Sequence, residues 1–108
     1  MKENIFLVGF SGTGKTNVGR ILAALLEYEY IDTDLQIEAD TGRSVTAIFA
    51  EDGEMAFRAL ESAVLEKICE HNYQVIATGG GIVLARENRT AMTANGYVVG
   101  LEARPETI

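Results

Sequence analysis

Apolar residues in this chain form short unbroken runs that alternate with stretches in which they recur every three or four positions. A strand covered on both faces is apolar at successive positions, whereas a half-buried helix is apolar at every third or fourth. The unbroken runs predict strands at 4–9, 30–32, 73–77 and 97–101. The spaced stretches predict helices at 15–28, 34–40, 44–49, 54–68 and 85–94. Such alternation predicts an α/β fold with a parallel sheet.

Two local signals refine this pattern. Ser44 is a good helix-capping residue and is expected to begin the third helix, which Asp52 and Gly53 then end. Gly100 falls inside the last predicted strand, where glycine packs poorly, so we expect that strand to be weakened or bulged.

Composition and charge exclude several classes of function. The 108 residues, 47% hydrophobic and 23% charged, suit a single domain spanning 1–108. The net charge of −7 disfavours binding to nucleic acid or to an anionic membrane. No apolar stretch approaches the ~20 residues that a membrane-spanning helix needs, and the single cysteine, Cys69, suits a reducing compartment. We therefore expect a soluble, cytoplasmic domain without nucleic-acid or membrane partners.

The last residues predict that the domain is incomplete at its carboxyl end. Ala103 to Glu106 have the composition of a loop that enters a new helix, with Pro105 in its first turn. The sequence reaches Ile108 before such a helix would form.

A glycine-rich segment between the first strand and the first helix is the most specific motif in the chain. The residues Gly9-Phe10-Ser11-Gly12-Thr13-Gly14-Lys15-Thr16 match G-x-x-x-x-G-K-[ST] at every defined position. In this motif backbone N–H groups and the amino end of a helix surround phosphates, and the lysine adds a positive charge. The motif thus predicts nucleotide phosphate binding by Gly12, Thr13, Gly14, Lys15 and Thr16, with the Thr16 hydroxyl available to magnesium.

Asp32 and Asp34 follow the second predicted strand, at the edge of the sheet where open α/β folds bind ligands. Their spacing places both on one face of an extended segment. Phosphoryl transfer needs a held metal and a group that orients or deprotonates the attacking hydroxyl, and the two carboxylates could divide these tasks. The alternative is a turn in which Asp34 only caps the next helix.

Two further features are candidates for substrate binding. The planar guanidinium of Arg58 could hold a substrate carboxylate through two hydrogen bonds, or Arg58 could only form helical ion pairs with Glu54 and Glu61. The glycines 79–81 after a buried strand permit close approach of backbone to a ligand, or only a tight strand-to-helix turn.

Together these motifs resemble the shikimate kinase family, which are small P-loop kinases. The likeness rests on G-F-S-G-T-G-K-T, I-D-T-D-L-Q-I-E, G-R-S-V-T-A-I-F-A-E-D-G-E-M-A-F-R-A-L-E and V-I-A-T-G-G-G-I-V, in the family's order and spacing. It implies a three-layer P-loop NTPase fold of the nucleoside-monophosphate-kinase-like group, and phosphorylation of the 3-hydroxyl of shikimate by ATP and Mg²⁺. The complete enzyme would be a monomer in the shikimate pathway of aromatic amino-acid biosynthesis.

The resemblance also implies a role for each motif. Lys15 would contact the β and γ phosphates, while Thr16 and Asp32 would hold magnesium. Asp34 would bind the substrate hydroxyls and act as base, and Arg58 would bind the shikimate carboxylate. The glycines Gly79, Gly80 and Gly81 would line the substrate pocket.

This chain departs from the family pattern because the family continues beyond the point that matches Ile108, with a lid that carries an essential arginine. We therefore expect the 108 residues to bind phosphate with little or no turnover. Two alternatives remain at this point. One is a related kinase such as a gluconate kinase, which shares the first loop but lacks the other motifs. The other is a non-catalytic phosphate-binding fragment.

Overall fold

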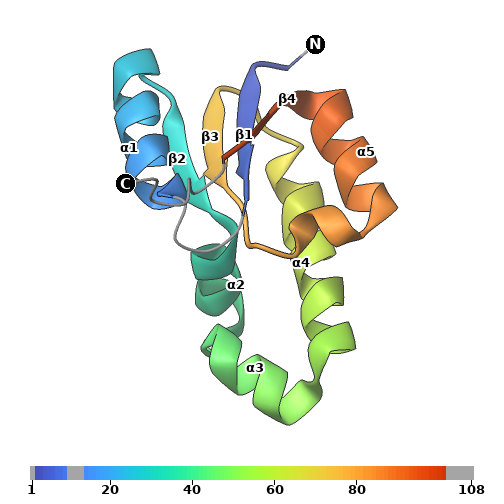
Figure 1. Ribbon diagram of the computed structural model, residues 1–108. Coiled ribbons are helices and arrows are strands. Elements are labelled where there is room, and N and C mark those ends of the chain that lie inside the picture. The colour runs from blue at the N-terminus through green and yellow to red at the C-terminus, as the bar shows by residue number, and fades with distance from the viewer. Residues whose placement is uncertain (1, 10–13, 102–108) are drawn as a thin grey trace, which may run out of the picture.

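The computed structural model describes residues 2–9 and 14–101, which form one parallel sheet with helices on both of its faces (Figure 1). The strands are β1 (Asn4–Val8), β2 (Glu29–Asp32), β3 (Gln74–Ala77) and β4 (Gly96–Gly100). All neighbouring strands run parallel, in the order β2-β3-β1-β4. The predicted α/β class and parallel sheet are confirmed. The expected loop and helix at 103–106 lie outside the described residues.

Five α-helices and one short 3₁₀ helix connect the strands. They are α1 (Lys15–Leu26), α2 (Thr33–Thr41), α3 (Val45–Asp52), α4 (Glu54–Ile68), η1 (Ile82–Leu84) and α5 (Arg86–Asn95). The sequence pattern predicted every α-helix but not η1, because three residues are too few to show a helical period. Ser44 caps α3 as expected, since its Oγ accepts a hydrogen bond from the backbone N–H of Ala47 at 3.0 Å.

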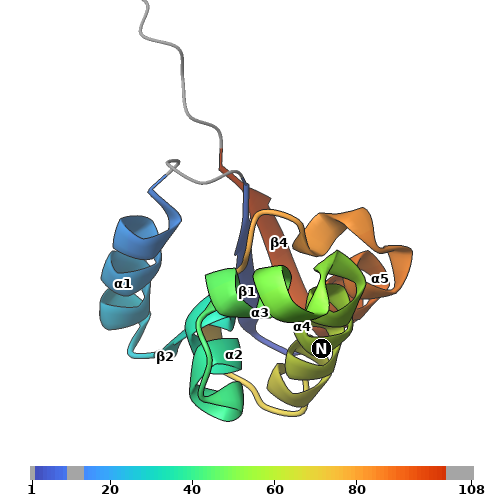
Figure 2. The same cartoon turned by 90° about the horizontal axis from the view of Figure 1, so that it is seen from below.

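The two faces of the sheet are covered unequally. The larger core lies between the sheet and the α4–α5 side and includes Phe6, Leu65 and Ile76, each at most 1% exposed. On the opposite face a smaller cluster joins Leu7 and Val75 to Ala23 of α1. Figure 2 shows α1 standing apart from the other helices across the sheet. These are the three layers that the family resemblance implied.

The register of β4 corrects the expectation of a bulge at Gly100. Each residue of β4 pairs with one residue of β1, from Asn4 with Gly96 to Val8 with Gly100. The backbone N–H of Leu101 then donates to the carbonyl of Val8 at 2.8 Å. The ladder therefore remains in register through the glycine.

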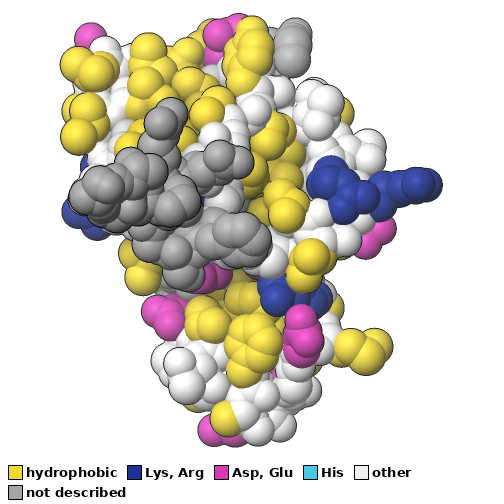
Figure 3. Space-filling model, in the orientation of Figure 1, with side chains coloured by type: hydrophobic (Ala, Val, Ile, Leu, Met, Phe, Trp, Pro, Cys, Tyr) yellow, Lys and Arg dark blue, Asp and Glu magenta, His cyan; other side chains and the backbone are white. Residues whose placement is uncertain are grey.

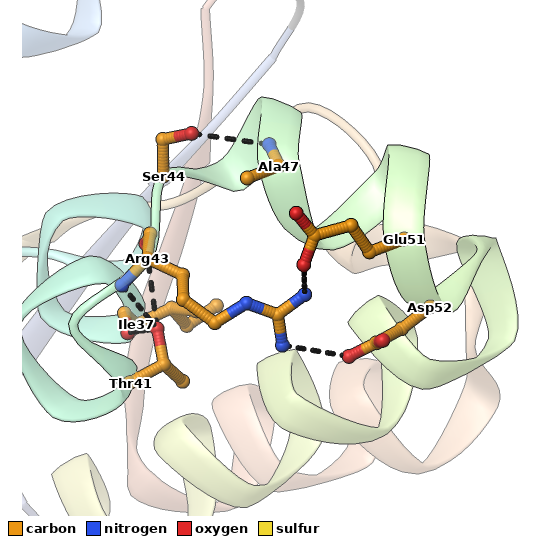
Figure 4. A network of polar contacts seen from close by, with 7 residues as sticks. All are labelled: Ile37, Thr41, Arg43, Ser44, Ala47, Glu51 and Asp52. Carbon is orange, nitrogen blue, oxygen red and sulfur yellow. Dashed lines mark hydrogen bonds and ion pairs between the residues drawn. The ribbon is translucent and has the colours of Figure 1, made fainter.

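The helices α2 and α3 form a lobe that projects from the carboxyl end of the sheet (Figure 1). Arg43, in the turn between them, donates to Glu51 and Asp52 at the end of α3, at 2.7 Å each (Figure 4). The Arg43 guanidinium also lowers the pKa of Asp52, chiefly through this hydrogen bond. The Glu38 carboxylate accepts from the backbone N–H of Val45 at 2.8 Å, so side chains bind the two helices to each other at both ends of the turn.

At the opposite, amino end of the sheet, one buried side chain joins three segments. The Asn4 amide donates to the carbonyls of His71 and Asn95 at 3.0 and 3.1 Å. Its oxygen accepts from the backbone and side-chain amides of Gln74 at 3.2 and 3.1 Å.

Within the described residues, no helix is long and apolar enough to cross a membrane.

Candidate active site

The candidate site lies at the carboxyl ends of β1, β2 and β3, where α1 and α2 begin. Gly14 precedes α1 with φ of 83°, a conformation that side chains strongly disfavour, and so the motif needs glycine there. Lys15 is the first residue of α1, and its ammonium donates to the carbonyl of Gly9. Gly12 and Thr13 lie outside the described residues.

A cavity of about 390 Å³ joins these residues to the ends of the neighbouring strands. Its walls include Lys15 and Thr16 from α1, the carboxylates Asp32 and Asp34, and the segment from Ala77 to Gly80 after β3. One cavity is therefore lined by residues of the phosphate loop and by the aspartate pair, which are separate motifs in the sequence.

Charges in this cavity perturb one another's protonation. Burial lowers the pKa of Lys15, although Asp34 and Asp32 oppose that change. Burial also raises the pKa of Asp34; the negative charges of Asp32 and Glu38 raise it further, while Lys15 and Arg58 act in the opposite sense. A carboxyl with a raised pKa binds a proton more readily, which suits a group that takes one from a hydroxyl.

The structure corrects the expected geometry of the aspartate pair. Asp32 is the last residue of β2, but Thr33 already begins α2, so the two carboxylates do not share an extended segment. The capping residue is Asp32, whose Oδ1 accepts from the backbone N–H of Leu35 at 3.0 Å. Asp34 lies in the first turn of the helix, and its buried Oδ1 has no hydrogen-bond partner within residues 2–9 and 14–101.

A second, smaller cavity of about 180 Å³ adjoins the first. Asp34, Gly79 and Gly80 line both. Its remaining walls come from the lobe and from α4, with Val45, Phe49, Phe57, Arg58, Glu61 and Gly81. Arg58 therefore lies beside Asp34 and the glycine turn, in the wall of this second cavity. It also forms both ion pairs of the alternative interpretation, with Glu54 at 3.3 Å and with Glu61 at 3.1 Å.

Glycines 79 and 81 lie close to side chains of the site. A Cβ on Gly81 would meet the guanidinium of Arg58, which would have to shift. A Cβ on Gly79 would lie 2.7 Å from Oδ1 of Asp34 and 3.1 Å from Oε2 of Glu61. The backbone N–H of Gly79 donates to the hydroxyl of buried Thr33 at 3.0 Å, which fixes the glycine turn against α2.

Glu61 is the residue of this site that the sequence analysis missed. It was considered only as an exposed ion-pair partner, but its side chain is 1% exposed. Burial raises its pKa, which the adjacent Arg58 opposes, and its Oε2 has no hydrogen-bond partner among the described residues. A signal was present: Glu61 lies four residues after Phe57 and three before Val64, on the apolar stripe of α4.

Comparison with known proteins decides the family. A model of the shikimate kinase family matches residues 11–108. The chain belongs to the shikimate kinase family. It is 51% identical over 105 residues to the shikimate kinase of Symbiobacterium thermophilum, a match that covers 97% of this chain and 60% of that protein. The chain thus spans about 60% of the length of this relative.

Solved shikimate kinases have the same fold. The enzyme from Acinetobacter baumannii, solved in complex with shikimate, superposes with a TM-score of 0.93 at 42% identity, covering 96% of this chain and 58% of that one. A gluconokinase from Sinorhizobium meliloti superposes with a TM-score of only 0.58 at 20% identity, covering 95% of this chain and 59% of that one. That second likeness shows a shared fold alone. The comparisons therefore confirm the shikimate kinase resemblance over the gluconate kinase alternative.

Proposed function

We propose that this chain carries the phosphate-binding and acceptor-binding parts of an enzyme that transfers the γ-phosphoryl group of ATP to the 3-hydroxyl of shikimate. The observation that supports this most strongly is the position of Asp34. Its carboxylate lines the cavity that contains Lys15 and also the cavity that contains Arg58. A hydroxyl held at Asp34 would thus lie between a phosphate site and a carboxylate site.

The phosphate end of the proposed site is formed by the start of α1. Lys15 would provide a positive charge for the β and γ phosphates, together with the backbone of Gly12, Thr13 and Gly14 and the positive end of the helix dipole. The Lys15 ammonium is already directed to the loop, since it donates to the carbonyl of Gly9.

The donor groups present suit a magnesium ion held together with phosphate. Mg²⁺ in phosphoryl-transfer sites typically takes one or two protein oxygens, with the remaining positions filled by water and phosphate. The Thr16 hydroxyl and the Asp32 carboxylate line the cavity, and Asp32 uses only Oδ1 to cap α2. In this proposal these two residues would hold the ion, which when bound neutralises the phosphate charge.

At the acceptor end, Asp34 would orient the attacking hydroxyl and accept its proton, a role that its raised pKa favours. Arg58 would bind the substrate carboxylate with its planar pair of N–H groups. Its contact with Glu54 is long, with Nε at 3.4 Å and Nη2 at 3.3 Å from the carboxylate, and is mostly exposed. A substrate carboxylate could replace it at small cost, while the buried contact with Glu61 persists. The absence of side chains at Gly79, Gly80 and Gly81 would leave room for the ring of shikimate.

Calorimetric titration tests the two ends of the site separately. ATP with Mg²⁺ is expected to bind the chain, and Lys15→Ala should abolish most of this affinity while the circular dichroism spectrum stays unchanged. Shikimate is expected to bind in preference to gluconate. Unchanged ATP binding in a folded Lys15→Ala variant would contradict the phosphate assignment, and preference for gluconate would contradict the acceptor assignment.

A further inference from the structure

A further cavity lies at the amino end of the sheet, opposite the candidate active site. Its volume is about 380 Å³, which falls within the range of about 300–1,000 Å³ that is typical of small-molecule sites. It shares no lining residue with the two cavities that meet at Asp34. The proposed kinase function therefore makes no use of this cavity.

Two strands and two helices enclose the cavity. Glu29 of β2 and Gln74 of β3 are paired across the sheet, so their side chains point to the same face. Ile31 points to that face too, because alternate residues of a strand do, and it packs against the larger core. Gln36 and Asp40 of α2 form one wall, and the last turns of α4 form the other. The cavity is therefore built from four separate segments of the chain.

The inner surface of the cavity is apolar except for one buried amide. We call Ile31, Val64 and Ile68 the aliphatic lining; the last two are at most 6% exposed. Gln74 is 2% exposed, and its Nε2 donates to Oδ1 of Asn4 at 3.1 Å and to the carbonyl of Ile68 at 3.0 Å. Asn4 belongs to β1, on the opposite side of β3 from β2, so the Oε1 of Gln74 lies toward β2 and the cavity. No described residue donates to this oxygen, which leaves it as an acceptor for a group in the cavity.

Charged groups of opposite sign line the two walls at the mouth of the cavity. Glu29 and Asp40 supply carboxylates from β2 and α2, whereas Lys67 and His71 supply nitrogen donors from α4 and the turn after it. All four residues are exposed, and no ion pair joins them within residues 2–9 and 14–101. His71 is the single histidine of the chain, and no histidine is visible in Figure 3, so this mouth does not open on the face drawn there. A small molecule that carries both charges would bridge the two walls.

We infer that this cavity binds a free α-amino acid with an aliphatic side chain. The ammonium group of the ligand donates to Oε1 of Gln74 and to the carboxylate of Glu29, which are neighbours in the paired strands. The carboxylate of the ligand accepts from Lys67 and His71, and its side chain packs on the aliphatic lining. A simple amine or a simple carboxylic acid would leave the charged groups of one wall without a partner.

Titration calorimetry with four small probes tests each part of this assignment on the 108-residue chain. L-Leucine carries all three groups and is expected to bind one-to-one with a Kd of about 1 mM or lower. Glycine lacks the apolar side chain, 4-methylpentanoate lacks the ammonium group, and 3-methylbutylamine lacks the carboxylate. Each of these three should bind at least about tenfold more weakly than leucine. Absence of leucine binding at about 10 mM, or binding of any one of the three as tight as that of leucine, would overturn the inference.

Nuclear magnetic resonance locates the bound leucine on the chain. Addition of leucine should shift the amide resonances of residues 29–31, 64–71 and 74, which surround the cavity. The amides of residues 14–16, at the phosphate end of the candidate active site, should not move. Shifts confined to 14–16 would show that leucine binds in the active-site cavity instead, and would contradict the assignment.

Matched variants separate this cavity from general charge effects. Lys67→Ala and Glu29→Gln each remove one charge from the mouth and should weaken leucine binding at least about tenfold. Arg86→Ala and Glu87→Gln remove the same charges from exposed positions of α5 and should leave it unchanged. Since all four side chains are exposed, folding should persist and is checked by circular dichroism. Equal leucine affinity in the two pairs of folded variants would show that the mouth does not bind the ligand.

Discussion

Nη1 of Arg58 donates a 3.1 Å hydrogen bond to Oε1 of Glu61, one turn further along α4. The two ends of this ion pair differ in environment, because the arginine side chain is 32% exposed and the glutamate 1%. Glu61, the buried partner, is fixed in position, and it holds the guanidinium of Arg58 beside the glycine turn. A charged group anchored in this way loses little conformational freedom when it binds a ligand.

Replacement of Glu61 should therefore weaken shikimate binding, although in the proposed arrangement Arg58 and not Glu61 contacts the substrate carboxylate. Glu61→Gln keeps the shape but removes the charge that orients Arg58, and charge-assisted hydrogen bonds are worth about 1.5–3 kcal/mol. We expect the KM for shikimate to rise roughly ten-fold or more, with the KM for ATP unchanged. Steady-state kinetics on a complete family enzyme carrying this sequence would measure both. Glu66→Gln, at an exposed position of the same helix, is the control.

The guanidinium shape of Arg58 should matter more than its charge. Lysine cannot form two parallel hydrogen bonds to a carboxylate. Arg58→Lys should raise the KM for shikimate by at least about tenfold, or ~1.4 kcal/mol, while ATP affinity changes little. Exposed Arg86→Lys is the matched control. Shikimate kinetics equal to wild type in Arg58→Lys would leave Arg58 as a structural ion-pair residue only.

Substitutions of Asp32 and of Asp34 should impair different properties of the enzyme. Asp34→Asn should chiefly lower kcat, because an amide cannot accept the hydroxyl proton. Asp32→Asn should preserve the cap of α2, since asparagine caps helices as well as aspartate does, but should shift the magnesium dependence of the rate to higher concentration. Rates measured across a magnesium titration distinguish the variants. The same defect in both at every concentration would refute the division of roles.

Asp34 should also impose a pH dependence on stability. Burial raises its pKa above the ordinary 3.8 in the folded protein, so the folded state binds this proton more tightly than the unfolded state does. Its favourable contribution is then complete below the ordinary pKa and is lost as pH rises through the raised one. Urea unfolding of the 108-residue chain from pH 4 to pH 7 should show a steeper fall in stability than in Asp34→Asn. Parallel slopes would show that Asp34 titrates normally.

The sequence predicted the elements of the fold more completely than their packing. Unbroken apolar runs indicated the four strands, and Ser44 indicated the start of α3. The pattern could not show which residues of α1 meet the sheet, because the small Gly19 and Ala23 carry a weaker hydrophobic signal than Val18 or Leu25. Close packing of α1 on β2 depends on small side chains: a Cβ on Gly19 would lie 2.7 Å from the Tyr30 ring.

For the candidate site, the sequence predicted the residues but not all of their relations. The motif from Gly9 to Thr16 has fixed spacing and therefore indicated its own location. Arg58 and Glu61 were visible as a pair at helical spacing. However, the burial of Glu61 depends on the lobe and the glycine turn closing over α4, which are contacts between distant segments. Asp32 caps α2 and Asp34 is buried because Thr33 is helical rather than extended. The pattern of apolar and polar residues cannot show the conformation of a single residue, so the sequence did not predict this distinction.

The order of strands has a consequence for how this chain folds during synthesis. Of the four described strands, β1 is made first but lies in the interior of the sheet, between β3 and β4, which are the last two of the four to be made. The Asn4 side chain likewise finds its partners 67, 70 and 91 residues later. Contacts so distant in sequence form slowly, because a long loop must close first. On the ribosome, β1 would therefore have both edges unpaired until most of the domain has emerged, and during that interval it would be the segment most in need of a chaperone.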